Sequence, residues 1–123
     1  MSKTILIADD GVEMRKLTRK VIETISASLV CIEAVDGLEA VEKTRELAPD
    51  LLILDLSMPR LNGLDAARAL RSAGSRVPII LFTLHADSIS LLQASAAGID
   101  AIVAKVGDLD ALVSQVERLL APA

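Results

Sequence analysis

Short apolar runs alternate along this chain with longer segments in which apolar positions recur at helical spacing. The apolar runs predict strands at residues 4–8, 29–34, 51–54, 79–82 and 100–104. The longer segments predict helices at residues 12–26, 37–47, 64–72 and 87–97, and a last helix that Asp108 caps and that runs to about residue 120. Strands and helices in regular alternation predict an α/β fold with a doubly wound, five-stranded parallel sheet and five helices. A closed barrel of this kind needs eight such units, which favours the open sheet.

Polar residues follow four of the five predicted strands at the point where each strand ends. Asp9 and Asp10 follow the first strand and Asp55 follows the third, while Thr83 and Lys105 follow the fourth and fifth. Open parallel sheets bind ligands at the carboxyl ends of their strands, beside the point where the strand order reverses. We therefore expect these side chains to meet at one edge of the sheet.

The residue types at this edge suit phosphoryl transfer with a divalent cation. Three neighbouring carboxylates repel one another unless they take up protons, bind a cation or pair with a base. Mg²⁺ prefers oxygen ligands and is held by few carboxylates together with a phosphate oxygen. Lys105 carries a compact positive charge that can hold a phosphoryl oxygen or pair with Asp55, and the Thr83 hydroxyl can donate a hydrogen bond. These are the parts of a site with a carboxylate nucleophile.

With this set of residues, the chain resembles the receiver domains of response regulators in bacterial two-component signalling. The resemblance covers essentially residues 1–123 and implies a flavodoxin-like fold with strand order 2-1-3-4-5, in a stand-alone, single-domain protein. The residues that carry it are Asp9 and Asp10, Asp55 with Met58, Pro59 and Gly63 after it, Thr83, and Lys105.

The resemblance implies a role for each residue of the site. Asp55 is the phosphoacceptor, and its phosphoryl donor is a histidine kinase or a histidine phosphotransfer protein. Asp10, Asp55 and the backbone carbonyl of Ser57 ligate Mg²⁺, and Asp9 assists through water. Thr83 and Lys105 contact the phosphoryl group. The protein would catalyse its own phosphorylation and dephosphorylation with Mg²⁺ but would not be a turnover enzyme.

Two positions depart from the family pattern. Val106 follows Lys105, where receivers usually have a proline, so we expect a trans peptide bond there. Ile102 stands where receivers carry an aromatic residue that reports phosphorylation. The signal would then leave the site through another element, and the helix at 87–97, which follows Thr83, is our candidate.

Charge and composition narrow the partners and the compartment. The net charge of −4 argues against direct binding of nucleic acid. No apolar stretch approaches the ~20 residues that a membrane span needs, so no membrane insertion and a cytoplasmic location are expected. The single cysteine, Cys31, lies in an apolar run and is expected to be buried and inert, which fits a reducing compartment.

Several surface features have both a structural and a functional interpretation. The helix at 12–26 carries Arg15, Lys16, Arg19 and Lys20, which form either a solvated face or the docking surface for the kinase. The helix at 87–97 carries little charge, and its outer face is either tolerated or binds a partner, including a second copy in a homodimer. His85 is a solvated loop residue or affects the lifetime of the phosphorylated state. The downstream target is not indicated.

Three other functions compete with a stand-alone receiver. The chain could be a receiver fragment of a longer regulator. A Mg²⁺-dependent aspartyl-phosphate phosphatase or phosphotransferase would need a second aspartate two residues after the nucleophile, where Ser57 stands. A flavin-binding protein of flavodoxin type would need a phosphate-binding loop after the first strand, where Asp9 and Asp10 would repel a phosphate.

Overall fold

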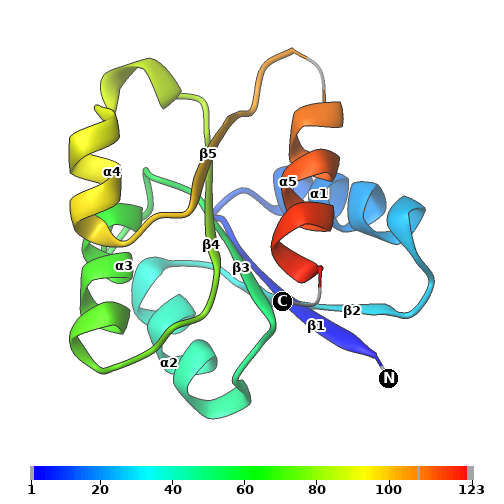
Figure 1. The fold of residues 1–123 in the computed structure, drawn as a ribbon, viewed down its shortest axis with the longest axis horizontal. Coiled ribbons are helices and arrows are strands. Elements are labelled where there is room, and N and C mark those ends of the chain that lie inside the picture. Colours follow the sequence, from blue (N-terminus) through cyan, green and yellow to red (C-terminus); the bar gives the residue numbers. More distant parts are fainter. Residues whose placement is uncertain (1, 108, 122–123) are drawn as a thin grey trace.

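The computed structural model describes residues 2–107 and 109–121. Its single sheet has five parallel strands in the order β2-β1-β3-β4-β5 (Figure 1). The strands are β1 (Lys3–Ala8), β2 (Leu29–Ala34), β3 (Leu51–Leu54), β4 (Ile79–Thr83) and β5 (Ala101–Ala104). The helices are α1 (Val12–Ile25), α2 (Gly37–Leu47), α3 (Gly63–Ser72), α4 (Leu91–Ala97) and α5 (Asp110–Leu120), with a short 3₁₀ helix η1 (Ala86–Ser88) before α4. The predicted doubly wound sheet and its strand order are confirmed.

Helices cover both faces of the sheet (Figure 1). Alternate residues of β1 point to opposite faces, so that Leu6 packs with α2, α3 and α4 while Ile5 and Ile7 pack with α1 and α5. Strands β3 and β4 are buried along their whole length, and β1 is buried from Ile5 to Ala8. This burial explains why these three strands consist mainly of apolar residues. Burial of apolar surface, at about 25 cal/mol per Å², is the main force that holds the strand ends in place.

The predicted helix at 87–97 is wrong in its first part. Residues Ala86–Ser88 form η1, and α4 begins only at Leu91. The Ser90 hydroxyl accepts a hydrogen bond from the Gln93 amide at 3.0 Å, and the Gln93 side chain accepts one from the Ser90 amide at 3.1 Å. This reciprocal capping box fixes the start of the helix after Ser90. Gly98 ends α4 in the left-handed conformation, with φ of 83°.

The other element boundaries either match the predictions, as in β2, α2 and β3, or differ from them by one or two residues. Strand β1 begins one residue earlier than expected, β4 includes Thr83, and α3 already begins at Gly63. The Asp36 side chain caps α2 by accepting a hydrogen bond from the Glu39 amide at 2.8 Å. The predicted cap at Asp108 lies outside the described residues, and α5 is described from Asp110 onward.

Cys31 is less buried than expected because β2 is an edge strand, and its side chain is half-buried. Burial nevertheless raises the pKa of its thiol above the ordinary value, which disfavours the reactive thiolate. The peptide bond between Lys105 and Val106 is trans, as expected, and residues 2–107 and 109–121 contain no cis peptide bond. None of the helices described is both long and apolar enough to span a membrane.

Candidate functional site

Three aspartates meet at the carboxyl ends of β1 and β3, two adjacent strands at the centre of the sheet. One carboxylate oxygen from each of Asp9, Asp10 and Asp55 lies within 4.8 Å of the others. Asp9 and Asp55 are buried, whereas Asp10 is exposed. The strand order brings these residues together, because the chain leaves β1 and β3 toward opposite faces and opens a crevice between the two loops.

Lys105 neutralises part of this negative charge from the end of β5. Its ammonium Nζ lies 2.5 Å from Asp9 Oδ2 and 3.2 Å from Asp55 Oδ2, and its side chain is only 5% exposed. The expected pair with Asp55 is present, but the shorter contact with Asp9 was not predicted. A hydrogen bond from the Lys105 amide to the Thr83 carbonyl, at 2.9 Å, fixes the backbone that aims this side chain.

The surroundings of Asp55 make its charged form costly. Burial raises the pKa of the Asp55 carboxyl above its ordinary value, the Lys105 ammonium opposes that rise, and the Asp9 carboxylate adds to it. The Lys105 ammonium therefore does not fully offset the cost of burying the Asp55 carboxylate. A divalent cation at this position would favour the ionised carboxylates, which is a physical reason to expect metal binding here.

A cavity of about 370 Å³ opens over these groups, and we call it the acidic pocket. Its lining residues are Asp9, Asp10, Gly11, Met14, Asp55, Ser57, Leu84, His85 and Lys105. An adjoining cavity of about 600 Å³ shares Asp10 and Ser57 with it. The acidic pocket thus combines carboxylate, hydroxyl and ammonium groups, and its oxygen atoms are of the kind that Mg²⁺ prefers.

Thr83 lies behind the acidic pocket and does not line it. The side chain is fully buried at the end of β4, and its Oγ1 accepts a hydrogen bond from the His85 amide at 3.0 Å. His85, in contrast, does line the pocket. For the Thr83 hydroxyl to reach a group bound at Asp55, this hydrogen bond and the loop that makes it would have to rearrange.

A family model decides which class of protein has this site. The model of the response regulator receiver domain matches residues 5–117. The chain belongs to the response regulator receiver family. It is a CheY-like receiver domain of two-component systems, and its fold and site lie in the same part of the sequence as the match.

Several individual proteins are similar to this receiver domain in sequence or in structure. Chemotaxis protein CheY from Thermotoga maritima is 34% identical over 85% of this chain and 87% of its own length. The protein-glutamate methylesterase/protein-glutamine glutaminase of Nocardioides sp. is 34% identical over 96% of this chain and 34% of its own length. The crystal structure of response regulator TrrA from Thermotoga maritima, in complex with Mg²⁺-BeF, is 31% identical, with a TM-score of 0.86 over 96% of this chain and 99% of that one.

These relatives differ in how much of their length the receiver domain accounts for. The chain spans most of CheY, about half of response regulator MprA from Mycobacterium ulcerans, and about a third of the methylesterase. Receiver domains are phosphoacceptor switches that bind Mg²⁺ at a cluster of acidic residues and interact with histidine kinases or phosphotransfer proteins. They are generally not turnover enzymes.

The loop after β3 is held rigidly in this receiver domain. The Gly63 amide donates a hydrogen bond to the Leu56 carbonyl at 2.8 Å, and a Cβ atom at Gly63 would overlap the backbone carbonyl of Asp55. Arg60 adopts the left-handed conformation, with φ of 69°, and its Nη1 lies 3.3 Å from Asp36 Oδ2. These contacts fix the backbone around Ser57, whose carbonyl is an expected metal ligand.

One residue at this site was missed by the sequence analysis. The Arg15 guanidinium, on α1, donates a hydrogen bond from Nη1 to the backbone carbonyl of Asp9 at 2.8 Å. In the sequence, Arg15 belongs to a basic helical face that favours a solvated or docking role. No spacing pattern distinguishes it from Lys16, which is exposed and lies 3.8 Å from Glu13.

Proposed function

We propose that residues 1–123 form one receiver domain that accepts a phosphoryl group on Asp55 from a histidine kinase or a histidine phosphotransfer protein. One observation carries this proposal. Asp55 is buried at the end of a central strand, where its carboxylate lies within 4.8 Å of two other carboxylates and 3.2 Å from the Lys105 ammonium. Phosphoryl transfer depends mainly on positioning and on neutralising charge, and this arrangement supplies both.

The same geometry supports a division of labour among the three aspartates toward Mg²⁺. Asp10 is exposed, and among the described residues its carboxylate has no hydrogen bond or ion pair, so it is free to ligate the metal together with Asp55 and the Ser57 carbonyl. Asp9 already accepts hydrogen bonds from the Gly11 amide at 2.8 Å and from Lys105. It therefore fits a contact through water. The bound cation would neutralise charge on the carboxylates and on the phosphoryl oxygens.

The transfer itself uses few protein groups. An Asp55 carboxylate oxygen attacks the phosphorus atom of a phosphohistidine, and the P–N bond breaks as the new P–O bond forms. Lys105 pairs with a phosphoryl oxygen in place of its present contact with Asp55, and Thr83 donates its hydroxyl to another. Attack of water on the acyl phosphate releases inorganic phosphate and restores the carboxylate. The domain therefore carries a signal rather than turning over a substrate.

A phosphatase or phosphotransferase with an aspartyl intermediate is less well supported. That chemistry needs a general acid two residues after the nucleophile, and the side chain there is the Ser57 hydroxyl, which is too weak an acid for the purpose. The receiver function is the same whether or not the domain is joined to an output domain, as it is in several relatives.

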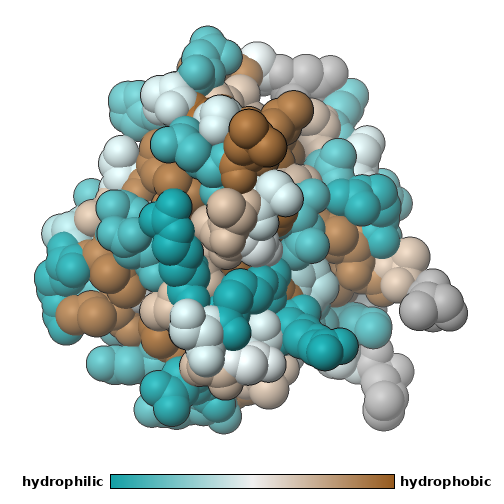
Figure 2. All heavy atoms as spheres, turned by 60° about the vertical axis from the view of Figure 1, so that its left-hand side comes forward, coloured by the Kyte–Doolittle hydropathy of each residue, from teal (hydrophilic) through white to brown (hydrophobic). Residues whose placement is uncertain are grey.

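Two surfaces are candidates for the protein partners. On α1, Lys16 and Lys20 are exposed and would meet an acidic patch of the phosphoryl donor. On α4, Leu91 and Leu92 are more than 80% exposed. Figure 2 brings the α4 side of the molecule forward and shows apolar side chains among hydrophilic ones in the upper part of the view. We propose this apolar surface for the downstream partner or a second copy, and no direct role in binding nucleic acid.

The decisive experiment is phosphorylation by a small donor. The protein should gain the mass of one phosphoryl group when it is incubated with acetyl phosphate and Mg²⁺, as measured by intact-protein mass spectrometry. The variant Asp55→Asn should gain none. A matched control is Asp50→Asn, because Asp50 precedes β3 as Asp55 follows it, and its side chain accepts a hydrogen bond from the Thr4 amide at 2.7 Å, away from the acidic pocket. Uptake by Asp55→Asn at the parent rate would show that the acceptor is another residue.

A further inference from the structure

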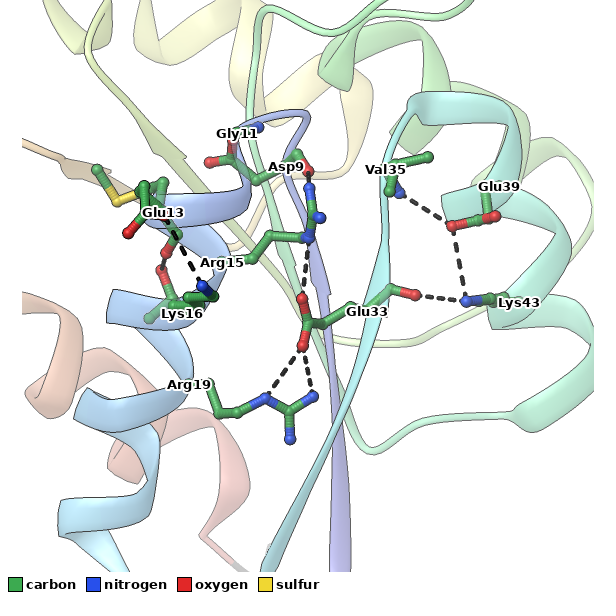
Figure 3. Close-up of polar contacts among 12 residues, drawn as sticks. Asp9, Gly11, Glu13, Arg15, Lys16, Arg19, Glu33, Val35, Glu39 and Lys43 are labelled. Carbon is green, nitrogen blue, oxygen red and sulfur yellow. Dashed lines mark hydrogen bonds and ion pairs between the residues drawn. The ribbon is translucent and has the colours of Figure 1, made fainter.

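A single arginine connects the acidic pocket to a cluster of charges on the edge of the sheet. Arg15 Nη1 donates to the Asp9 carbonyl at 2.8 Å, and Arg15 Nε donates to Glu33 Oε1 at 2.9 Å. Figure 3 shows this guanidinium between the two residues, one at the end of β1 and the other on β2. The Arg15 side chain is only 13% exposed, so both contacts are made largely out of water.

Glu33 is itself held firmly. Its Oε2 atom accepts hydrogen bonds from Arg19 Nε at 3.0 Å and Arg19 Nη2 at 2.6 Å, while its backbone carbonyl accepts one from Lys43 Nζ at 2.5 Å (Figure 3). The hydrogen bond with Arg19 is the largest cause that lowers the pKa of the Glu33 carboxyl below its ordinary value. Glu33 is therefore an ionised anchor that presents one oxygen atom to Arg15 in a fixed direction.

The Asp9 carbonyl is the group that needs this anchor. The Asp9 amide still follows the sheet pattern and donates to the Ala34 carbonyl at 3.1 Å, but the chain then turns away into α1. Within residues 2–107 and 109–121, no strand amide donates to the carbonyl of this buried residue, and Arg15 supplies the donor. The next residue is Asp10, so the Arg15 contact also sets the direction in which the chain leaves Asp9.

We propose that Arg15 is a positioning residue of the receiver site, which fixes the corner formed by Asp9 and Asp10 and is itself fixed by Glu33. This inference rests on the proposed function, because its consequence is the affinity for Mg²⁺ and the rate of phosphoryl uptake. Asp10 and Asp55 come from separate strands, and a shift at the corner of β1 would change the distance between their carboxylates. Metal sites of this kind are sensitive to the groups that orient their ligands.

The shape of the guanidinium is essential to this role. Its planar fork donates from two different nitrogen atoms, so it can bind the Asp9 carbonyl and the Glu33 carboxylate at once. A lysine in its place would keep the charge but would present one compact ammonium on a flexible stem. The variant Arg15→Lys therefore separates the requirement for geometry from the requirement for charge.

The test measures metal binding by titration calorimetry, and phosphoryl uptake from acetyl phosphate by mass spectrometry, on protein shown to be folded by circular dichroism. The variant Arg15→Ala should bind Mg²⁺ about tenfold more weakly and take up phosphoryl groups correspondingly more slowly, as for other groups that orient metal ligands. Arg15→Lys should show an intermediate loss of about threefold. The control Arg68→Ala removes one positive charge from an exposed pair with Asp65 and should match the parent.

The outcomes distinguish this inference from the proposed function. A purely structural role would lower the melting temperature of Arg15→Ala and leave the Mg²⁺ affinity of the folded protein unchanged, and that result would overturn the inference alone. If Arg15→Ala does not fold, an affinity of Arg15→Lys equal to that of the parent overturns it in the same way. If the parent itself neither binds Mg²⁺ nor takes up a phosphoryl group, the proposed function fails, and the inference fails with it.

Discussion

The three carboxylates of the acidic pocket differ in the protein groups that already hold them. Asp9 accepts hydrogen bonds from the Gly11 amide and the Lys105 ammonium, and Asp55 lies 3.2 Å from the same ammonium. The Asp10 carboxylate is exposed, and among the described residues it has no such partner. The two neighbouring aspartates thus have different surroundings, because Asp9 is buried and Asp10 is exposed.

This difference predicts unequal effects on metal binding. Asp10→Ala should weaken Mg²⁺ binding by about tenfold, or ~1.4 kcal/mol, because we propose Asp10 as a direct ligand. Asp9→Ala should weaken it less, because the contact that we propose for Asp9 is through water and its carboxylate already binds Lys105. Calorimetric titration with Mg²⁺ checks this. A value for Asp10→Ala equal to that of the parent would exclude Asp10 from direct coordination of the metal.

His85 should affect the lifetime of the phosphorylated state, since its side chain lines the acidic pocket through which water must approach Asp55. An imidazole there either orients the attacking water or obstructs it. We expect His85→Ala to change the decay rate of phosphorylated Asp55 by more than about threefold, or ~0.65 kcal/mol in the barrier. The decay is followed by mass spectrometry after removal of the donor. Equal rates for parent and variant between about pH 6 and 8 would make His85 a bystander.

At the residue scale, the sequence predicted which side chains share one edge of the sheet but not how they bond. Asp9, Asp55 and Lys105 could be placed together because each follows a strand, and parallel strands end at the same edge. The shorter contact of Lys105 with Asp9, and the contact of Arg15 with the Asp9 carbonyl, depend on side-chain directions across elements. Periodicity within one element contains no such information.

At the scale of elements, the segment between β4 and α4 is the part that the sequence described least well. One helix was expected over residues 87–97, whereas Leu84–Ala97 contains an exposed loop, η1 and α4. The capping box between Ser90 and Gln93 was not recognised, and few apolar positions indicate where this helix starts. Within α4, the small residues Ala94 and Ala97 are buried, whereas the large residues Leu91 and Leu92 are exposed. Segments with few buried contacts open more easily.

This segment should respond most strongly to phosphorylation. The Thr83 hydroxyl oxygen accepts a hydrogen bond from the His85 amide at 3.0 Å. A rotation of Thr83 toward a phosphoryl group would break this hydrogen bond and free the loop that leads to α4. With beryllofluoride as the phosphoryl mimic, hydrogen exchange should change most in Leu84–Ala97. The variant Thr83→Ala should lose that change while keeping the change near Asp55. A response confined to the loop after β3 would favour a phosphate relay or sink over a conformational switch.

At the scale of the whole molecule, the fold could be predicted because five strand–helix units leave few topologies open. The alternation of elements required a parallel sheet, and five strand–helix units are too few for a closed barrel, which needs eight. The strand order itself came from the resemblance, since periodicity does not order strands. The bounds of the central strand β3 were predicted correctly, because β3 coincides with its apolar run at both ends. Edge positions such as Cys31 were predicted less well, because exposure depends on neighbours that lie far away in the sequence.

The proposed role of Asp55 requires a buried, negatively charged carboxylate. This charge should lower the free energy of unfolding when no metal is present. Burial raises the pKa of Asp55 in the folded protein above its unfolded value, so the folded state binds the proton more tightly. The resulting cost is therefore fully present above the folded pKa and disappears as the pH falls below the unfolded value. Since asparagine resembles the protonated carboxyl, Asp55→Asn should have the higher melting temperature near neutral pH in the presence of a chelator.

Thermal unfolding of parent and variant across a pH series, followed by circular dichroism, measures this effect. The advantage of Asp55→Asn should shrink steadily as the pH is lowered, and the control Asp50→Asn should not show the same trend, because Asp50 is exposed. Adding Mg²⁺ near neutral pH should stabilise the parent but not Asp55→Asn, because the variant lacks the Asp55 carboxylate, which we propose as a direct ligand of the metal. A parent more stable than Asp55→Asn in chelator would mean that the pair with Lys105 outweighs the burial of the charge.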